Sequence, residues 1–155
     1  MTPGINQAKR KKIPYTVHEY IHDVSCDSYG SEAASKMGVS EERVFKTLVV
    51  QLGTKELVVG VIPVSSMLNM KLIAKATGSK KARMAEGAEV ERSTGYVLGG
   101  VSPLGQKKSL KTIIHASAKQ YSTIFVSAGR RGLEIELQPQ DLAKITQAKF
   151  AKICQ

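Results

Sequence analysis

Acidic side chains are scarce in this chain of 155 residues. It holds 13 Asp and Glu against 23 Lys and Arg, so its formal net charge at pH 7 is +10. This excess indicates a polyanionic partner, with nucleic acid ahead of a membrane surface. No apolar run approaches the ~20 residues of a membrane span, and the N-terminal segment lacks the apolar stretch of a signal peptide. We therefore expect a cytoplasmic protein with no membrane partner.

Cysteine is also rare. Cys26 and Cys154 lie far apart and lack the Cys/His spacing of a zinc site or the pattern of a disulfide framework, so both are predicted to be free thiols. Cys26 is a candidate nucleophile with His18 or His22 as its base. Its polar, loop-like surroundings favour an incidental cysteine instead. We expect neither a metal site nor a cofactor.

The short signatures of common enzyme classes are missing as well. There is no GxSxG, no Walker sequence, no HExxH and no GxGxxG after a strand. His18, His22 and His115 lie within or beside predicted strands without an evident partner carboxylate, so none of them is predicted to be a general base. Any catalysis is therefore expected to depend on positioned backbone groups and hydroxyls.

What the sequence does contain is a glycine-rich stretch at residues 93–108. Four glycines and Pro103 fall within it, and Lys107 and Lys108 are its last two residues. Glycine allows a backbone to approach a ligand closely, and the adjacent positive charge suits a phosphate-bearing partner. The alternative is a glycine-rich connection between strands, followed by solvated lysines.

The pattern of apolar residues predicts a mixture of helices and strands. Strands are predicted at residues 15–20, 44–52, 57–64, 96–98, 110–115, 123–126 and 133–137. Helices are predicted at residues 3–12, 31–37, 70–77, 86–92 and 139–148, several of them from cap residues. The strands at 44–52 and 57–64 are expected to form a central hairpin. A turn at 127–132 is expected to join a second hairpin.

Regular β-α-β alternation is absent, so the order of these elements predicts an α+β fold. We expect a single domain over residues 1–155 with a mixed, mostly antiparallel, barrel-like sheet surrounded by short helices. Lys46 interrupts the most apolar strand. A lysine at such a place either extends its charge to the edge of the sheet or lies at a site that uses the charge.

Six segments stand out along the chain: MTPGI at the N-terminus, the end of the first strand at Tyr20, FKTLVV at 45–50, MLNMK at 67–71, STGYVLGGVSPLG at 93–105 and VSAGRRGLEIEL at 126–137. Together they resemble the YbaK family, the free-standing Cys-tRNA(Pro) deacylases related to the editing insertion domain of bacterial prolyl-tRNA synthetases. The resemblance extends over essentially the whole chain, with the segments in family order.

This resemblance implies trans-editing, in which cysteine is hydrolysed from proline tRNA after mischarging. The substrate's own thiol is expected to attack the ester, so that the protein supplies orientation and electrostatics but no nucleophile. The implied partners are tRNA(Pro) charged with cysteine and, in a ternary complex, prolyl-tRNA synthetase. Two alternatives stay open: a deacylase for alanine or serine, and a non-catalytic nucleic-acid-binding module on the same fold.

The resemblance also assigns residues. The expected catalytic positions are Tyr20, Lys46, Gly99, Gly100 and Ser127. The expected substrate-binding positions are Tyr29, where relatives often carry phenylalanine, Thr47, Asn69 and Pro103. The expected tRNA-binding positions, some of which could be merely solvated, are Lys71, Lys75, Lys107, Lys108, Lys111, Arg130 and Arg131. Glu134 aligns with a variable position and is not assigned a role.

Overall fold

The structure, a computed structural model, describes residues 1–25 and 28–155. Its α-helices within these ranges are α1 (Pro3–Arg10), α2 (Tyr29–Met37), α3 (Met70–Ala76), α4 (Gly87–Thr94) and α5 (Pro139–Thr146), and η1 (Ala116–Gln120) is a 3-10 helix. The strands are β1 (Tyr15–Glu19), β2 (Phe45–Leu52), β3 (Leu57–Pro63), β4 (Ala82–Met84), β5 (Lys111–His115), β6 (Ile124–Arg130), β7 (Leu133–Leu137) and β8 (Lys149–Ala151). No helix in the described ranges is both long and apolar enough to cross a membrane.

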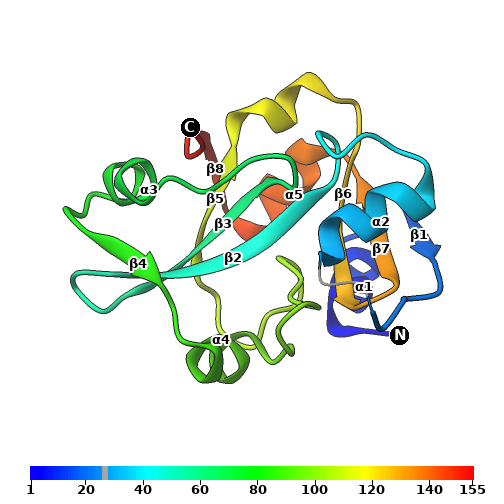
Figure 1. Cartoon of the computed structure of the whole chain (residues 1–155), viewed down its shortest axis with the longest axis horizontal. Helices are drawn as coiled ribbons and strands as arrows, with labels where there is room; N and C mark the ends of the chain where they lie inside the picture. Colours follow the sequence, from blue (N-terminus) through cyan, green and yellow to red (C-terminus); the bar gives the residue numbers. More distant parts are fainter. Residues whose placement is uncertain (26–27) are drawn as a thin grey trace.

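The strands form two sheets (Figure 1). The larger has the order β4-β2-β3-β5-β8, with β2 and β3 as an antiparallel hairpin and β5 and β8 added in parallel. The smaller has the order β1-β7-β6 and is antiparallel throughout. A parallel bridge between Val44 and Phe125 joins them. The predicted α+β class and the central hairpin are confirmed, and the sheets are not closed into a barrel.

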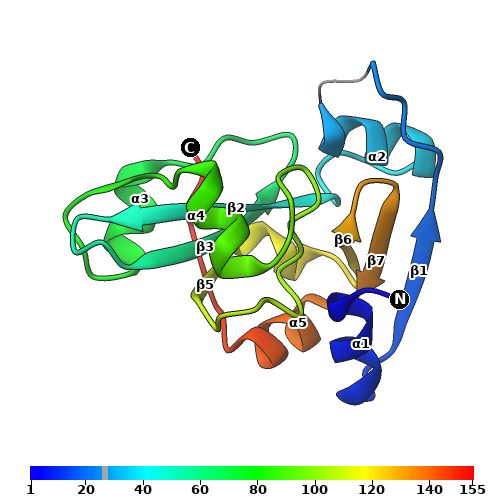
Figure 2. The same ribbon diagram turned by 90° about the horizontal axis from the view of Figure 1, so that it is seen from below.

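The main core lies between the two sheets. Alternation along β2 directs Phe45 and Val49 into this core, and alternation along β6 directs Ile124 and Val126 into it from the other side. Phe125 faces the opposite side of the smaller sheet, where the alanines of α2 cover it. Figure 2 shows the smaller sheet lying between α1 and α2. The far face of the larger sheet packs against α3 and the C-terminal residues.

Local signals account for most helix ends. The Thr2 side chain accepts a hydrogen bond from Ile5 N–H at 3.2 Å, and the Asn69 side chain accepts one from Leu72 N–H at 3.0 Å, as the predicted caps require. Gly38 ends α2 at a φ of 69°, a left-handed conformation that glycine adopts without a Cβ clash. Pro139 lies at the first turn of α5.

Two predictions of local structure are wrong, and three short elements were not predicted. Residues 96–98 form no strand, because Tyr96 turns inward after α4 and its hydroxyl donates to Leu104 C=O at 2.6 Å. Ser127 does not begin a turn: β6 continues to Arg130 through an irregularity in its pairing with β7, so only residues 131–132 form the tip of the hairpin. The three-residue strands β4 and β8, together with η1, are too short for the sequence pattern to reveal.

Candidate functional site

A cavity of about 330 Å³ opens between the two sheets. The strand β2 forms one wall with residues 45–49, α2 and the loop after α4 form the sides, and the hairpin of β6 and β7 closes the end. Most of the side chains around it are apolar, and its size is at the lower end of the roughly 300–1,000 Å³ typical of small-ligand sites. The cavity therefore suits a group about as large as one amino acid with part of a ribose.

Seven of the residues predicted from the family resemblance line this cavity. They are Tyr20, Tyr29, Lys46, Thr47, Gly99, Ser127 and Arg131. They come from segments far apart in the sequence, and the register between the sheets brings them together. Thr47 contributes a hydroxyl that is buried without a hydrogen-bond partner in the described part of the chain. Lys46 and Arg131 are the cations among the described lining residues.

Gly99 is a glycine for steric reasons. Its φ is 88°, and a Cβ at this position would lie 2.7 Å from Arg131 Nε and 2.7 Å from Tyr29 Cε2. Both distances are too short for any side chain. The N–H groups of Gly99 and Val101 donate to no other described group, although both residues line the cavity. The loop thus brings free backbone donors to the cavity wall.

Other predicted positions lie outside the cavity. Gly100 packs on β6, where an added Cβ would lie 2.9 Å from Arg130 Cα, and its N–H donates to Val97 C=O at 3.0 Å. Asn69 caps α3, and its side-chain oxygen is occupied by Leu72 N–H. Pro103 lines a separate, smaller pocket. The structure does not bring these three together with the seven that line the cavity.

Glu134 is the cavity residue that the sequence left unassigned. It lies on β7 opposite Ser127 of β6, only 7% exposed, and its carboxyl forms no hydrogen bond or ion pair with any described residue. Burial away from water raises the pKa of its carboxyl from 4.5 to about 8. It is the single acidic residue among the described lining residues. The cavity therefore contains one carboxyl that is largely protonated when empty.

The cavity mouth is bridged by a stacked pair. The Arg131 guanidinium lies over the Tyr29 ring, 3.7 Å from its centroid, and Arg131 Nη2 donates to Leu98 C=O at 3.5 Å. The bridge connects α2, the loop after α4 and the tip of the second hairpin. The hydroxyl that distinguishes Tyr29 from phenylalanine does not affect this stacking, since the ring face makes the contact.

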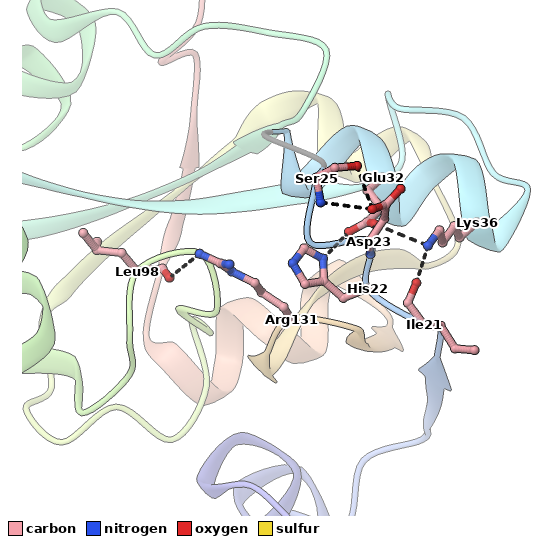
Figure 3. A network of polar contacts seen from close by, with 8 residues as sticks. All are labelled: Ile21, His22, Asp23, Ser25, Glu32, Lys36, Leu98 and Arg131. Atoms are coloured by element: carbon pink, nitrogen blue, oxygen red, sulfur yellow. Dashed lines mark hydrogen bonds and ion pairs between the residues drawn. The ribbon is translucent and has the colours of Figure 1, made fainter.

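A buried carboxylate holds the segment before α2 in place (Figure 3). Glu32 is 6% exposed and accepts from His22 at 2.6 Å and from Asp23 N–H at 2.6 Å, with Lys36 Nζ at 3.4 Å. Burial alone would raise the pKa of Glu32, but these three donors outweigh it and leave the pKa below its usual value. His22 also lies edge-on against Tyr29, so the network supports the ring that carries Arg131.

The histidines differ from the sequence prediction, which gave them no evident partner carboxylate. His18 and His22 do have partner carboxylates: His18 Nε2 lies 2.9 Å from Glu136 Oε1, and His22 is bonded to Glu32. Glu136 lies far from His18 in sequence and Glu32 lies 10 residues from His22, so neither pair falls within one predicted element. His115 Nδ1 accepts from Ile153 N–H at 3.2 Å, and burial lowers its pKa. None of the three lines the cavity, and Cys26, the candidate nucleophile that the sequence favours as an incidental cysteine, lies outside the described residues.

Residues 24–145 match the family described as the aminoacyl-tRNA editing domain. The chain belongs to this family. The resemblance to YbaK proteins is thereby confirmed. An Enterococcus faecalis protein named "putative Cys-tRNA(Pro)/Cys-tRNA(Cys) deacylase EbsC" is 40% identical over 153 residues, which cover 98% of this chain and 92% of that protein.

Two further relatives agree with this membership in the editing-domain family. The uncharacterised Bacillus subtilis protein YwhH is 30% identical over 118 residues, 76% of this chain and 74% of its own length. The crystal structure of "a putative trans-editing enzyme for prolyl tRNA synthetase" superposes with a TM-score of 0.85 over 100% of this chain and 99% of that one. At 20% identity, this second likeness establishes the shared fold.

The cations expected to contact tRNA do not form one surface of this editing domain. Arg131 lines the cavity, and Arg130 Nη2 lies 3.6 Å from Glu19. Lys108 and Lys111 border a shallow pocket that also contains Glu56 and Glu89. The remaining three, Lys71, Lys75 and Lys107, do not line the cavity. The predicted set is thus split between several faces.

Proposed function

We propose that this protein is a trans-editing deacylase that hydrolyses the ester of Cys-tRNA(Pro) and releases cysteine from the tRNA 3′ end. The whole chain, residues 1–155, acts as one editing unit in this proposal. The observation that carries it is the set of charged groups in the cavity: among the described lining residues, Glu134 is the acidic one and Lys46 and Arg131 are the cations. An aminoacyl ester presents the complementary charges, an α-ammonium group and a ribose phosphate.

The α-ammonium group is the natural partner of Glu134. A cation beside this buried carboxyl would favour its charged form and lower its pKa again, so that the ion pair forms only when the substrate is present. A buried charged pair of this kind depends strongly on geometry. It therefore selects for an amino acid with a free α-amino group. In this arrangement Lys46 and Arg131 bind the phosphate and ribose oxygens.

The ester carbonyl requires hydrogen-bond donors for its developing negative charge. The N–H groups of Gly99 and Val101 are available, and the Thr47 hydroxyl is buried without a hydrogen-bond partner in the described residues. Preorganised donors at such a carbonyl are worth several kcal/mol in the transition state. Gly100, whose N–H is already bonded to Val97, is replaced by Val101 in this role.

The nucleophile in this mechanism is the cysteine thiol of the substrate. Its sulfur forms a bond to the ester carbon, the bond from that carbon to the ribose oxygen breaks, and the ribose oxygen takes up the thiol proton. Water then opens the resulting cyclic thioester to give cysteine. The described lining residues include neither cysteine nor histidine, which supports a reaction in which the protein orients the attacking group.

Ester loss from Cys-tRNA(Pro) tests the proposal. We expect release of cysteine well above the rate in buffer, and little release of alanine or serine from the same tRNA. Lys46→Ala and Ser127→Ala are expected to lower the rate. The matched control is Lys11→Ala, at the residue that follows α1 and does not line the cavity. Full activity in both cavity variants would refute the site assignment. Faster loss of alanine or serine would favour a deacylase for another small amino acid.

We further propose that a domain of this size relies on prolyl-tRNA synthetase to select the tRNA. The Enterococcus faecalis relative is named for cysteine esters of both proline and cysteine tRNA, which supports weak discrimination between tRNAs by the domain itself. Adding the synthetase should accelerate deacylation of Cys-tRNA(Pro) over Cys-tRNA(Cys). Equal rates on the two tRNAs, with and without the synthetase, would contradict this partnership.

A further inference from the structure

The segment that contains α3 and β4 carries positive charge without an acidic residue. Between Glu56 and Glu86 the sequence has no Asp or Glu at all. The same stretch contains five exposed cations, which we call the α3–β4 edge: Lys71, Lys75, Lys80, Lys81 and Arg83. None of them takes part in an ion pair within the described part of the chain. Their charge is thus directed to solvent.

The fold holds these cations at a sheet edge. The strand β4 pairs with β2, with Met84 opposite Val50 and Arg83 opposite Gln51, and α3 packs against β4 (Figure 1). Arg83 Nη2 donates to Gln51 Oε1 at 2.7 Å, which orients the guanidinium on the edge strand. Arg83 therefore lies on the edge strand itself, while Lys71 and Lys75 lie on α3 and Lys80 and Lys81 lie between α3 and β4.

The α3–β4 edge continues from the cavity mouth. Met84 and Ala85, directly after Arg83, line the cavity, and β2 runs from Lys46 in the cavity wall to Gln51 beside Arg83. At ~3.3 Å per residue, those five steps along β2 span about 17 Å. A stacked nucleic-acid strand rises ~3.4 Å per phosphate, so this path matches several consecutive nucleotides.

Two other groups of cations lack this arrangement. The α1 end carries four exposed residues at positions 9–12, but no residue of α1 lines the cavity. Lys108 and Lys111 border a pocket that they share with Glu56 and Glu89, whose carboxylates oppose an anionic ligand. The α3–β4 edge is the group that combines unbalanced charge with direct continuity to the cavity.

We propose that the α3–β4 edge binds the phosphate backbone of the tRNA strand that leads to the aminoacylated 3′ end. Lys80, Lys81 and Arg83, which lie nearest the cavity in sequence, make the contacts closest to the ester. Lys71 and Lys75 on α3 extend the path outward. The direction of the strand rests on the proposed function, since an aminoacyl ester in the cavity fixes where the 3′ end lies. The contacts themselves require only phosphate and positive charge.

The test compares two triple variants with the same change in charge. Lys80→Gln, Lys81→Gln and Arg83→Gln remove three cations from the α3–β4 edge, and Arg10→Gln, Lys11→Gln and Lys12→Gln remove three from the α1 end. Binding of uncharged, fluorescently labelled tRNA(Pro) is measured by anisotropy from about 50 to about 200 mM salt. Loss of three single-strand phosphate contacts lowers the slope of log K against log salt by about 2. The α1 variant keeps the wild-type slope.

Each outcome decides the proposal. Equal slopes for all three proteins, or equal slope losses for both variants, would overturn it. If the α3–β4 variant loses binding to vesicles containing phosphatidylserine while its tRNA binding is unchanged, the edge binds a membrane surface. That result would also overturn the proposal. Deacylation by the wild type is measured in parallel. If the α3–β4 variant alone loses slope while the wild type releases no cysteine, the edge stands as a tRNA surface and the proposed deacylase activity fails.

Discussion

Replacing Glu134 by glutamine should make the protein more stable and less active. Glutamine keeps the shape of the side chain but cannot ionise, and Glu134 is buried without a partner in the described residues. Wild-type folding must keep this carboxyl protonated at a pH where the unfolded chain releases the proton. The glutamine variant does not bind this proton, so its free energy of folding carries no such cost.

The magnitude follows from the pKa, which burial raises from 4.5 to about 8. Below about pH 4.5 the carboxyl is protonated in both states, so the full folding stability is present. Between that pH and about pH 8 only the unfolded chain loses the proton, and the free energy of unfolding falls by up to about 5 kcal/mol. From about pH 5 to about pH 8, the stability gained by Glu134→Gln over the wild type should therefore grow by about 4 kcal/mol.

Urea denaturation of both proteins at the two pH values measures this difference, with Glu136→Gln as the control. Glu136 has the opposite behaviour, since hydrogen bonding to Thr123 outweighs burial and lowers its pKa. In the same proteins, loss of the charged partner of the substrate's ammonium group should reduce kcat/KM for Cys-tRNA(Pro) by about 10- to 100-fold. A Glu134→Gln advantage that does not change with pH would refute the reasoning, because Glu134 would then be ionised in the folded chain.

Three further substitutions test the cavity and its support. Gly99→Ala places a methyl group 2.7 Å from Arg131 and Tyr29 at a φ of 88°, so kcat should fall at least about tenfold. Equal weakening of tRNA binding would return the loop to a phosphate-binding role. Arg131→Lys keeps the charge but loses the stacking and the fork that reaches Leu98, and KM should rise about 2- to 20-fold, whereas an unchanged KM would contradict the bridge. Glu32→Gln should lower the free energy of unfolding by about 3 kcal/mol in urea titrations. Because the Glu32 pKa is lowered, the wild type should lose this stabilisation as the pH falls below about 4.5. A stability difference between wild type and Glu32→Gln that stays constant with pH would contradict this role of Glu32.

Features encoded by neighbouring residues were predictable. The Asn69 cap and the Gly38 helix end each need only a few residues, and the apolar runs of β2 and β3 predict the central hairpin. The irregularity after Ser127 was not predictable, because the sequence SAGRRG has the composition of a turn. Its continuation as a strand depends on pairing with β7.

The candidate site likewise contains residues that the sequence predicts and one that it does not. Seven cavity residues followed from the family resemblance, but Glu134 did not. The alternating residues 133–137 place Glu134 and Glu136 on the same face of β7 and give no reason to treat them differently. The tertiary structure separates them, since Glu136 bonds to Thr123 while Glu134 is buried at the cavity wall. The partners of His18 and His22 were hidden for the same reason, since Glu136 lies on β7 and Glu32 on α2, outside the segments of their histidines.

The most direct test of the proposed mechanism is the rate of ester loss from tRNA(Pro) charged with cysteine, relative to the same tRNA charged with S-methylcysteine. Methylation leaves the α-ammonium group, the ester and the approximate size unchanged, but it removes the attacking thiol. Because an oriented intramolecular nucleophile supplies most of the acceleration, we predict a rate at least about 100-fold higher for cysteine. Equal rates for the two esters, both above the rate in buffer, would contradict attack by the substrate thiol.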